Sequence, residues 1–163
     1  MLSIWVLNIL FTFIRKLSKP EKMKLFFRKM GEGPPVIILH GLYGSSDNWI
    51  TIARALSDSY TIYIPDQRNH GKSPHSSRHD YIEMTADIEE LVQENIGGKF
   101  ILLGHSMGGK VAINFALKHP ERIASLIVAD ISPFSRYPDD LAIVESHEKI
   151  LKTLLYTDIS SAA

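Results

Sequence analysis

Residues 100–109 read FILLGHSMGG, and this stretch decides the fold. Residues 100–103 form a continuous apolar run, which is typical of a parallel strand buried on both faces. Residues 107–118 have the apolar spacing of a helix, and Pro120 lies just past its end. Between the two, Gly104-His105-Ser106-Met107-Gly108 matches G-x-S-x-G, a pattern that places a serine on a tight turn from strand to helix.

The turn at Ser106 limits which residues can surround it. A serine whose hydroxyl projects above the sheet needs a strained backbone, and a side chain at Gly104 or Gly108 would collide with the adjoining strand or helix. Ser106 also lies at a helix N-terminus, where the helix dipole favours a developing negative charge. We therefore predict that Ser106 is a nucleophile. The alternative is a chance strand-to-helix turn.

Strand and helix alternate along the chain on both sides of this stretch. Apolar runs predict strands over residues 24–30, 36–39, 60–64, 100–103 and 125–129. Helical spacing predicts helices over residues 46–56, 81–96, 107–118 and 141–155. This alternation predicts an α/β fold with a doubly wound, mostly parallel sheet covered by helices on both faces. We expect residues 24–30 to form an edge strand.

Two of these helices have a defined apolar face. In helix 46–56 the residues expected to face inward are Trp49, Ile52, Ala53 and Leu56. In helix 81–96 they are Met84, Ile88, Leu91 and Val92. Ser46 or Asp47 is expected to cap the first helix, and Gly97-Gly98 to end the second.

Polar residues follow four of the predicted strands at the point where each strand ends. In chain order they are His40-Gly41, Asp66, Gly104-His105-Ser106 and Asp130. The carboxyl ends of parallel strands meet at one edge of a sheet, and ligands of open α/β sheets bind there. The sequence therefore predicts a site at this edge.

The loop that follows strand 36–39 reads His40-Gly41-Leu42-Tyr43-Gly44-Ser45. A turn of this kind can present a free backbone N–H toward Ser106. We predict that the N–H groups of Leu42 and Met107 form a two-donor oxyanion hole. His40, Gly41 and His105 are expected to contribute to substrate binding, His40 chiefly by bracing the loop. The alternative is a plain turn with glycines for steric reasons.

Four motifs in this order and spacing resemble the α/β-hydrolase superfamily. They are His40-Gly41, the segment Asp66-x-Arg68-Asn69-His70-Gly71-x-Ser73, the Gly104-x-Ser106-x-Gly108 turn and Asp130-Ile131-Ser132-Pro133. The second motif resembles the branch of small acyl-ester hydrolases. The resemblance covers residues 24 to about 135 and implies esterase or thioesterase chemistry without a cofactor. In that chemistry Ser106 attacks an acyl carbonyl, and water then cleaves the acyl-enzyme.

The resemblance implies the chain order serine, acid, histidine for the catalytic residues. Asp130 follows the strand after the nucleophile strand, so it is expected to be the acid. The alternative is an aspartate that only caps the next turn. The family's histidine lies in a loop after the last strand of the sheet. The chain thus resembles the N-terminal two-thirds of a hydrolase, with a C-terminally incomplete sheet, and its activity is expected to be impaired.

No histidine of the chain fits the role of the base. His119 lies at the far end of helix 107–118, about 18 Å along its axis, so it is expected to point away from the site. His147 lies in a charged segment and is expected to be a solvated surface residue. His70 and His75 are closer to the site, but the family pattern gives neither a base role.

The chain divides into three predicted parts. Residues 1–22 form an apolar and basic extension, residues 23–135 the N-terminal part of the hydrolase core, and residues 136–163 the start of a helical cap region. The apolar run at the N-terminus is shorter than the roughly 20 residues that span a membrane. Three interpretations remain open: an anchor, an interfacial helix whose residues 1–17 make weak membrane contact, or an upstream start codon. We favour the last two.

Composition excludes several function classes. The 163 residues carry 18 Lys and Arg against 18 Asp and Glu, for a formal net charge of zero, which argues against a nucleic-acid partner. The chain has no cysteine, so disulfides, thiolate zinc sites and a cysteine nucleophile are excluded. No P-loop or paired-histidine spacing occurs, so we expect no metal. The expected location is the cytoplasm.

Two other function classes stay open. The chain can be a catalytically dead hydrolase-fold fragment or binding module that keeps the fold without the base. It can also be an acyltransferase or a carbon–carbon hydrolase, because the fold alone does not separate these activities. If the sheet is incomplete, an inner strand becomes an exposed apolar edge, and self-association through that edge is expected.

Overall fold

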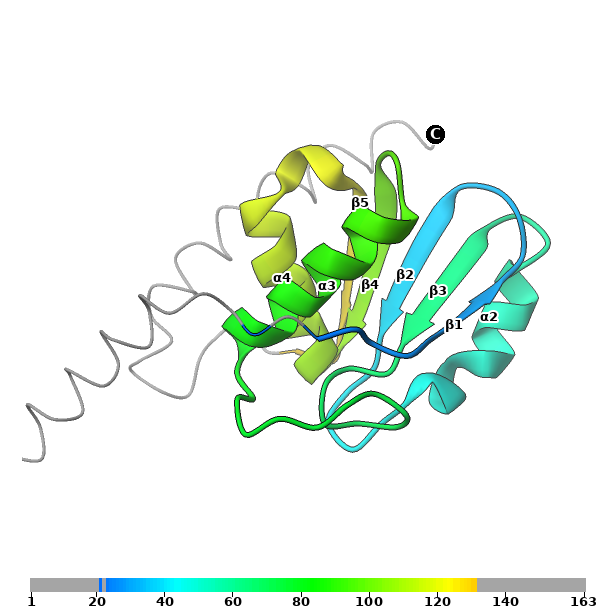
Figure 1. Cartoon of the computed structure of the whole chain (residues 1–163). Coiled ribbons are helices and arrows are strands. Elements are labelled where there is room, and N and C mark those ends of the chain that lie inside the picture. The colour runs from blue at the N-terminus through cyan, green and yellow to red at the C-terminus, as the bar shows by residue number, and fades with distance from the viewer. Residues whose placement is uncertain (1–20, 22, 132–163) are drawn as a thin grey trace, which may run out of the picture.

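The computed structural model describes Glu21 and residues 23–131 (Figure 1). These residues form a sheet with the strand order β1-β3-β2-β4-β5. Its strands are β1 (Phe27–Met30), β2 (Pro35–Leu39), β3 (Thr61–Pro65), β4 (Phe100–His105) and β5 (Ile123–Ala129). β1 pairs antiparallel with β3, and all the other pairs are parallel. The predicted mostly parallel sheet, with residues of the 24–30 segment at its edge, is confirmed.

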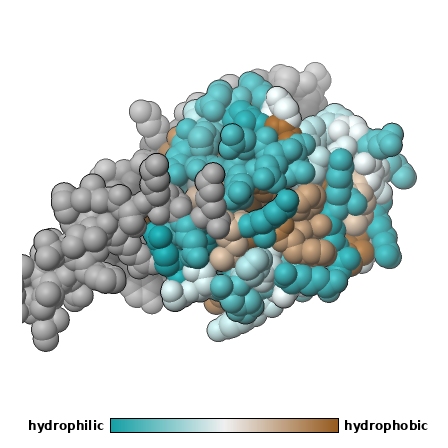
Figure 2. All heavy atoms as spheres, viewed as in Figure 1, coloured by the Kyte–Doolittle hydropathy of each residue, from teal (hydrophilic) through white to brown (hydrophobic). Residues whose placement is uncertain are grey.

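Helices cover both faces of the sheet. The helix α3 (Tyr81–Asn95) lies beside α4 (Met107–Lys118) on one face, and α2 (Ile50–Leu56) packs on the other (Figure 1). Two short 3₁₀ turns, η1 (Ser46–Trp49) and η2 (Pro120–Arg122), precede α2 and β5. The surface over α3 and α4 is mostly hydrophilic, as expected for amphipathic helices, and apolar residues show beside them (Figure 2).

The central strand β2 is buried on both faces, as its continuous apolar sequence predicts. Ile37 and Leu39 belong to the hydrophobic cluster under α3 and α4, whereas Val36 and Ile38 belong to the cluster on the α2 side. Burying a side chain of this kind stabilises the fold by about 1.5–3 kcal/mol. Because its side chains pack on both faces of the sheet, β2 is held firmly, and so is the start of the loop that follows it.

The N-terminal cap of the segment at 46–56 differs from the prediction. Ser45 is the cap: its hydroxyl accepts a hydrogen bond from the N–H of Asp47, and its own N–H donates to the Asn48 side chain at 2.8 Å. Ser46 is buried instead, and its hydroxyl accepts a hydrogen bond from Arg28. The prediction of Ser46 or Asp47 as the cap is therefore wrong, since the cap lies at the residue before Ser46 and the segment begins with a 3₁₀ turn.

The inward-facing residues of α3 are confirmed, but those of the earlier helix are confirmed only in part. Ala53 is buried, and Trp49 and Leu56 pack against the core on the α2 side. Ile52 is 46% exposed, so the prediction that it faces inward is wrong. Since Trp49, Ala53 and Leu56 pack inward and Ile52 does not, the face that packs on the core is narrower than the helical spacing predicts.

Several predictions fall on residues that the structure does not describe. They include the N-terminal extension, the helix at 141–155 with His147, and the cap region, so the three-part division of the chain stays a prediction. Over Glu21 and residues 23–131, none of the helices has the length and apolar character needed to cross a membrane.

Candidate active site

Backbone strain gathers at the carboxyl ends of the parallel strands. Among the described residues, the non-glycine residues with positive φ are Tyr43 (61°), Asn69 (64°), Ser106 (50°) and Asp130 (55°). Each of them follows a different strand of β2 to β5. Such conformations cost about 1–3 kcal/mol each and cluster at functional sites. The strain therefore marks the edge at which the sequence predicts a site.

Ser106 joins β4 to α4 in an unusual conformation, with φ 50° and ψ −116°. Its N–H donates a hydrogen bond of 2.9 Å to the carbonyl of Ala129 in the neighbouring strand β5. Its carbonyl accepts a hydrogen bond of 2.9 Å from the N–H of Gly109, in the first turn of α4. The serine is thus fixed from both sides in the strained turn that the motif predicts.

The two glycines of the motif leave no room for side chains. A Cβ atom added at Gly104 would lie 2.4 Å from the carbonyl oxygen of Gly108, across the turn. A Cβ atom at Gly108 would lie 2.5 Å from the carbonyl oxygen of Leu39, at the end of β2. The steric prediction for both positions is confirmed, and α4 approaches the backbone of β2 closely because of it.

The loop after β2 passes directly against the serine. A Cβ atom added at Gly41 would lie 2.8 Å from Nδ1 of His105 and 3.3 Å from Cβ of Ser106. The loop then turns tightly, since the N–H of Gly44 donates to the Gly41 carbonyl at 3.0 Å. The structure therefore brings Gly41 and His105 together beside Ser106, with Leu42 next in the chain.

The His40 side chain contacts both the start of this loop and the segment after β3. Its ring is fully buried, with Nδ1 2.8 Å from the Gly41 carbonyl oxygen and Nε2 3.0 Å from the N–H of Gln67. Burial lowers the pKa of His40, and this effect outweighs the opposing hydrogen bond to Gly41. A neutral ring that donates from Nδ1 and accepts at Nε2 satisfies both partners. Both ring nitrogens are occupied, so His40 braces the loop.

Asp66, at the end of β3, fastens two more segments to this edge. Its buried carboxylate accepts hydrogen bonds from the N–H of Ser46 at 2.6 Å and from the N–H of Lys72 at 2.8 Å. Burial by itself would raise the pKa of Asp66, but these hydrogen bonds, with that of the Ser46 hydroxyl, prevail and lower it. Asp66 is therefore an ionised anchor for η1 and the following loop.

Asp130 lies beside the nucleophile turn at the end of β5. Its carboxylate is 84% exposed and lies 3.6 Å from Nε2 of His105. Because β5 is the neighbour of β4, Asp130 and Ser106 follow adjacent parallel strands. This position suits an acid that orients an imidazole, and its assignment as the acid stays a prediction.

The other histidines lie away from the serine hydroxyl. His119 contacts Glu89 at 3.0 Å, at the end of α4 opposite to Ser106. The ring of His70 packs between His40 and His79, with centroid distances of 5.2 and 5.7 Å. Over residues 23–131 no hydrogen bond joins a histidine ring to the Ser106 hydroxyl, and no cluster of three or more metal-binding side chains occurs.

A cleft of about 390 Å³ opens beside the nucleophile turn. Its walls come from the loop after β2, from η1 and α2, and from the turn after β4. The residues that line it are His40, Gly41, Leu42, Tyr43, Gly44, Asn48, Trp49, Ile52 and His105. Its volume falls in the range of about 300–1,000 Å³ that ligand pockets occupy.

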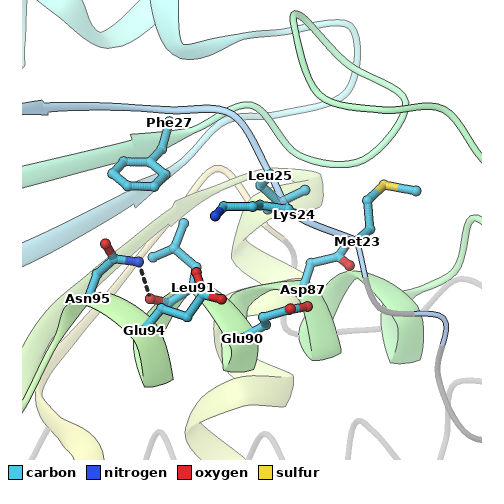
Figure 3. Close-up of a pocket in the computed structure, with 9 residues that line it drawn as sticks. All are labelled: Met23, Lys24, Leu25, Phe27, Asp87, Glu90, Leu91, Glu94 and Asn95. Carbon is cyan, nitrogen blue, oxygen red and sulfur yellow. Dashed lines mark hydrogen bonds between the residues drawn. The ribbon is translucent and has the colours of Figure 1, made fainter.

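A second hollow lies where the chain before β1 crosses α3, between Met23, Lys24 and Leu25 on one side and Glu90 and nearby residues on the other (Figure 3). Its volume is about 10 Å³, which is room for about one water molecule. The cleft beside Ser106 is therefore the better candidate for a substrate site.

Comparison with known proteins assigns the fold. A family model described as the alpha/beta hydrolase fold matches residues 34–160. The chain belongs to the α/β-hydrolase family. The solved structure of a marine microorganism esterase is similar to this chain, with a TM-score of 0.68 and 46% sequence identity, and the match covers 86% of this chain and 54% of that one.

Two curated relatives are also similar to this chain in sequence. The sn-1-specific diacylglycerol lipase ABHD11 of Danio rerio is 45% identical over 109 residues, which are 66% of this chain and 34% of the relative. A probable alcohol acetyltransferase of Saccharomyces cerevisiae is 38% identical over 139 residues, which are 77% of this chain and 41% of the relative. This α/β-hydrolase chain therefore spans well under half the length of the curated relatives it matches.

The sequence analysis did not predict a buried ion pair that connects the loop after β3 to α3. Nε and Nη2 of Arg68 donate hydrogen bonds of 2.6 and 2.7 Å to the two carboxylate oxygens of Asp87 on α3. Nη1 donates another, of 2.7 Å, to the carbonyl of Arg78. The one available signal was an aspartate on the otherwise apolar face of a helix. The pair ties the loop after β3 to α3.

Proposed function

We propose that this chain carries the nucleophile half of a serine hydrolase that cleaves small acyl esters or thioesters. The observation that supports this most strongly is the conformation of Ser106, which holds a serine in a strained turn at a helix N-terminus beside a cleft. The relatives support the same class, since one is named a diacylglycerol lipase and another an esterase.

In the proposed reaction, Oγ of Ser106 attacks the acyl carbonyl carbon and forms a tetrahedral intermediate. The N–H groups of Leu42 and Met107 donate hydrogen bonds to the oxyanion of that intermediate. The position of Gly41 against Ser106 supports this role for the next N–H of the loop. The C–O or C–S bond then breaks, and water later releases the acid from the acyl-enzyme.

The proton of Ser106 needs a base that receives it and passes it to the leaving group. No histidine among residues 23–131 is hydrogen bonded to the Ser106 hydroxyl. We therefore assign the base to a histidine outside the described residues, with Asp130 as the acid that orients it. Without a base, a residual acceleration over water of about 10³–10⁴ is typical of such sites.

The same acyl-enzyme also supports a second candidate function, acyl transfer. The relative from Saccharomyces cerevisiae is named a probable alcohol acetyltransferase. In acyl transfer an alcohol attacks the acyl-enzyme in place of water, and the product is a new ester. Product analysis in water with a competing alcohol separates the two activities.

Reaction with a fluorophosphonate probe tests the nucleophile. We expect slow labelling of the 163-residue chain and no labelling of Ser106→Ala. Ser59→Ala, an exposed serine in a turn remote from the cleft, serves as the matched control and should label like the parent. Equal labelling of the parent and of Ser106→Ala would contradict the assignment.

We also propose that β5, the last strand in the order of the described sheet, mediates self-association of the chain. β5 pairs with β4 along one side, and among the described residues no strand pairs with its other side. An unpaired strand edge offers its backbone N–H and C=O groups to a second chain. Membrane contact through residues 1–17 stays a prediction on the N-terminal sequence.

A further inference from the structure

Most of the exposed large apolar side chains of the described residues lie at the cleft. Five large hydrophobic residues of the described part are exposed, and three of them, Leu42, Tyr43 and Ile52, line the cleft. Tyr43 is 93% exposed and has a strained backbone. Exposed apolar groups that form a contiguous surface mark an interaction site, whereas scattered ones do not.

The cleft reaches His105, the residue before the nucleophile, and has an apolar wall. The ring of Trp49 meets the His105 ring edge-on at 6.3 Å, and His105 lies against Gly41 beside Ser106. No Asp, Glu, Lys or Arg lines the cleft. A charged ligand group would find no counter-ion there, so the cleft suits an apolar chain that extends away from Ser106.

The order of the strands decides which part of the substrate enters the cleft. The cleft lies on the side of β2, whereas Asp130 follows β5, so the two lie on opposite sides of β4. A base paired with Asp130 protonates the leaving group, which must therefore lie on the β5 side. The acyl chain then lies on the β2 side of Ser106, in the cleft against Leu42 and Trp49.

We propose that this cleft binds the acyl chain of the substrate and selects for acyl groups longer than acetyl, with Trp49 and Ile52 as specificity-determining residues. The proposal rests on the proposed function of Ser106. Each methylene that enters an apolar site is worth about 0.8 kcal/mol, which is about fourfold in affinity. Affinity should therefore rise about fourfold per methylene until the cleft is filled.

Tryptophan fluorescence tests the proposal without catalysis. The chain has two tryptophans, so Trp5→Phe leaves Trp49 as the reporter. We expect octanoate to change the Trp49 emission at concentrations at which acetate has no effect. Ile52→Asp should weaken octanoate binding at least tenfold. Ile82→Asp, the matched exposed isoleucine on α3, should bind like the parent, and circular dichroism checks that both variants fold.

The outcomes separate this proposal from the proposed function. Ser106→Ala should still bind octanoate, because the cleft does not need the hydroxyl. If octanoate binds and Ser106 never reacts with the fluorophosphonate probe, the hydrolase assignment fails and the cleft assignment stands. If Trp49 emission responds equally to acetate and octanoate, or if Ile52→Asp binds octanoate like the parent, the acyl-chain cleft is overturned.

Discussion

The backbone N–H of Gln67 donates a hydrogen bond of 3.0 Å to Nε2 of His40, and its side-chain amide donates another of 2.6 Å to the His40 carbonyl oxygen. His40 directly follows β2, and Gln67 is the second residue after β3, the parallel neighbour of β2. His40, the first residue of the loop beside Ser106, is therefore held in place by the segment that follows β3. Substitutions of His40 test how this loop is positioned without changing Ser106 itself.

His40→Ala should lower the free energy of unfolding by about 1–3 kcal/mol, because it leaves the buried N–H of Gln67 without an acceptor. Denaturant unfolding measures the change. His75→Ala, at an exposed position in the loop after β3, is the control and should stay within about 0.5 kcal/mol of the parent. Equal stabilities of the two variants would show that the His40 ring does not brace the loop.

Asp66 should give the chain an acid-sensitive contribution to stability. Its pKa is lower in the folded chain than in the unfolded one, so the contribution is present above about pH 4. It is lost as the pH falls through the folded pKa. Asp66→Asn should destabilise the chain by about 1.5–3 kcal/mol at pH 7 and by much less at pH 2.5. A penalty independent of pH would contradict the role of the charge.

Asp87→Ala should destabilise the chain by about 3–5 kcal/mol, because it removes the carboxylate that accepts two hydrogen bonds from the buried guanidinium of Arg68 and leaves Glu83, at 3.5 Å, as its remaining charged partner. Glu94→Ala, on the exposed side of the same helix, is the control. The double variant Arg68→Met with Asp87→Leu should recover much of the loss, since it removes both charges. If the double variant is less stable than Asp87→Ala, the ion pair is not the cause.

Gly108→Ala should cost at least 1–3 kcal/mol of stability, as is typical of overpacking, because its Cβ would meet the Leu39 carbonyl at 2.5 Å. Gly97→Ala offers a contrast, since nothing lies within 4 Å of a Cβ at that position. Thermal unfolding of both variants provides the comparison. Similar melting temperatures would mean that α4 can retreat from β2.

Ile127→Lys should shift the chain toward the monomer. Ile127 is 47% exposed on β5, and a lysine on an edge strand opposes strand-to-strand association. Sedimentation velocity measures the distribution of species over a range of concentrations. Ile82→Lys is the matched control on a helix and should associate like the parent, and a monomeric parent chain would rule out the edge proposal.

The sequence predicts the centre of the sheet well because the signals there are local. The apolar run of β2 and the motif at Ser106 each lie within ten residues, and the structure confirms the fold that they predict. The path of the loop beside Ser106 was also expected, since its glycines follow a buried strand. The roles of Leu42 and Met107 as donors stay predictions.

The remaining features depend on contacts that no local pattern reveals. Arg68 and Asp87 are 19 positions apart, and their pairing depends on how the loop after β3 folds back onto α3. Ile52 lines the cleft, whereas Ala53 and Leu56 on the same helix pack toward the core, and helical spacing alone does not separate these positions. The structure places the predicted residues His40, Gly41, Leu42 and His105 in the lining of the cleft, whereas the sequence did not predict that Trp49 and Ile52 lie there.

The backbone conformation of Ser106 lowers the stability of the fold at the position where the proposed reaction needs a hydroxyl. With φ 50° and ψ −116°, this position suits glycine better than any residue with a side chain, and Ser106→Gly would relieve part of the strain. Selection for folding alone would thus favour losing the serine. A chain that keeps a hydroxyl at this costly position accepts the trade-off between stability and activity that is common at catalytic sites.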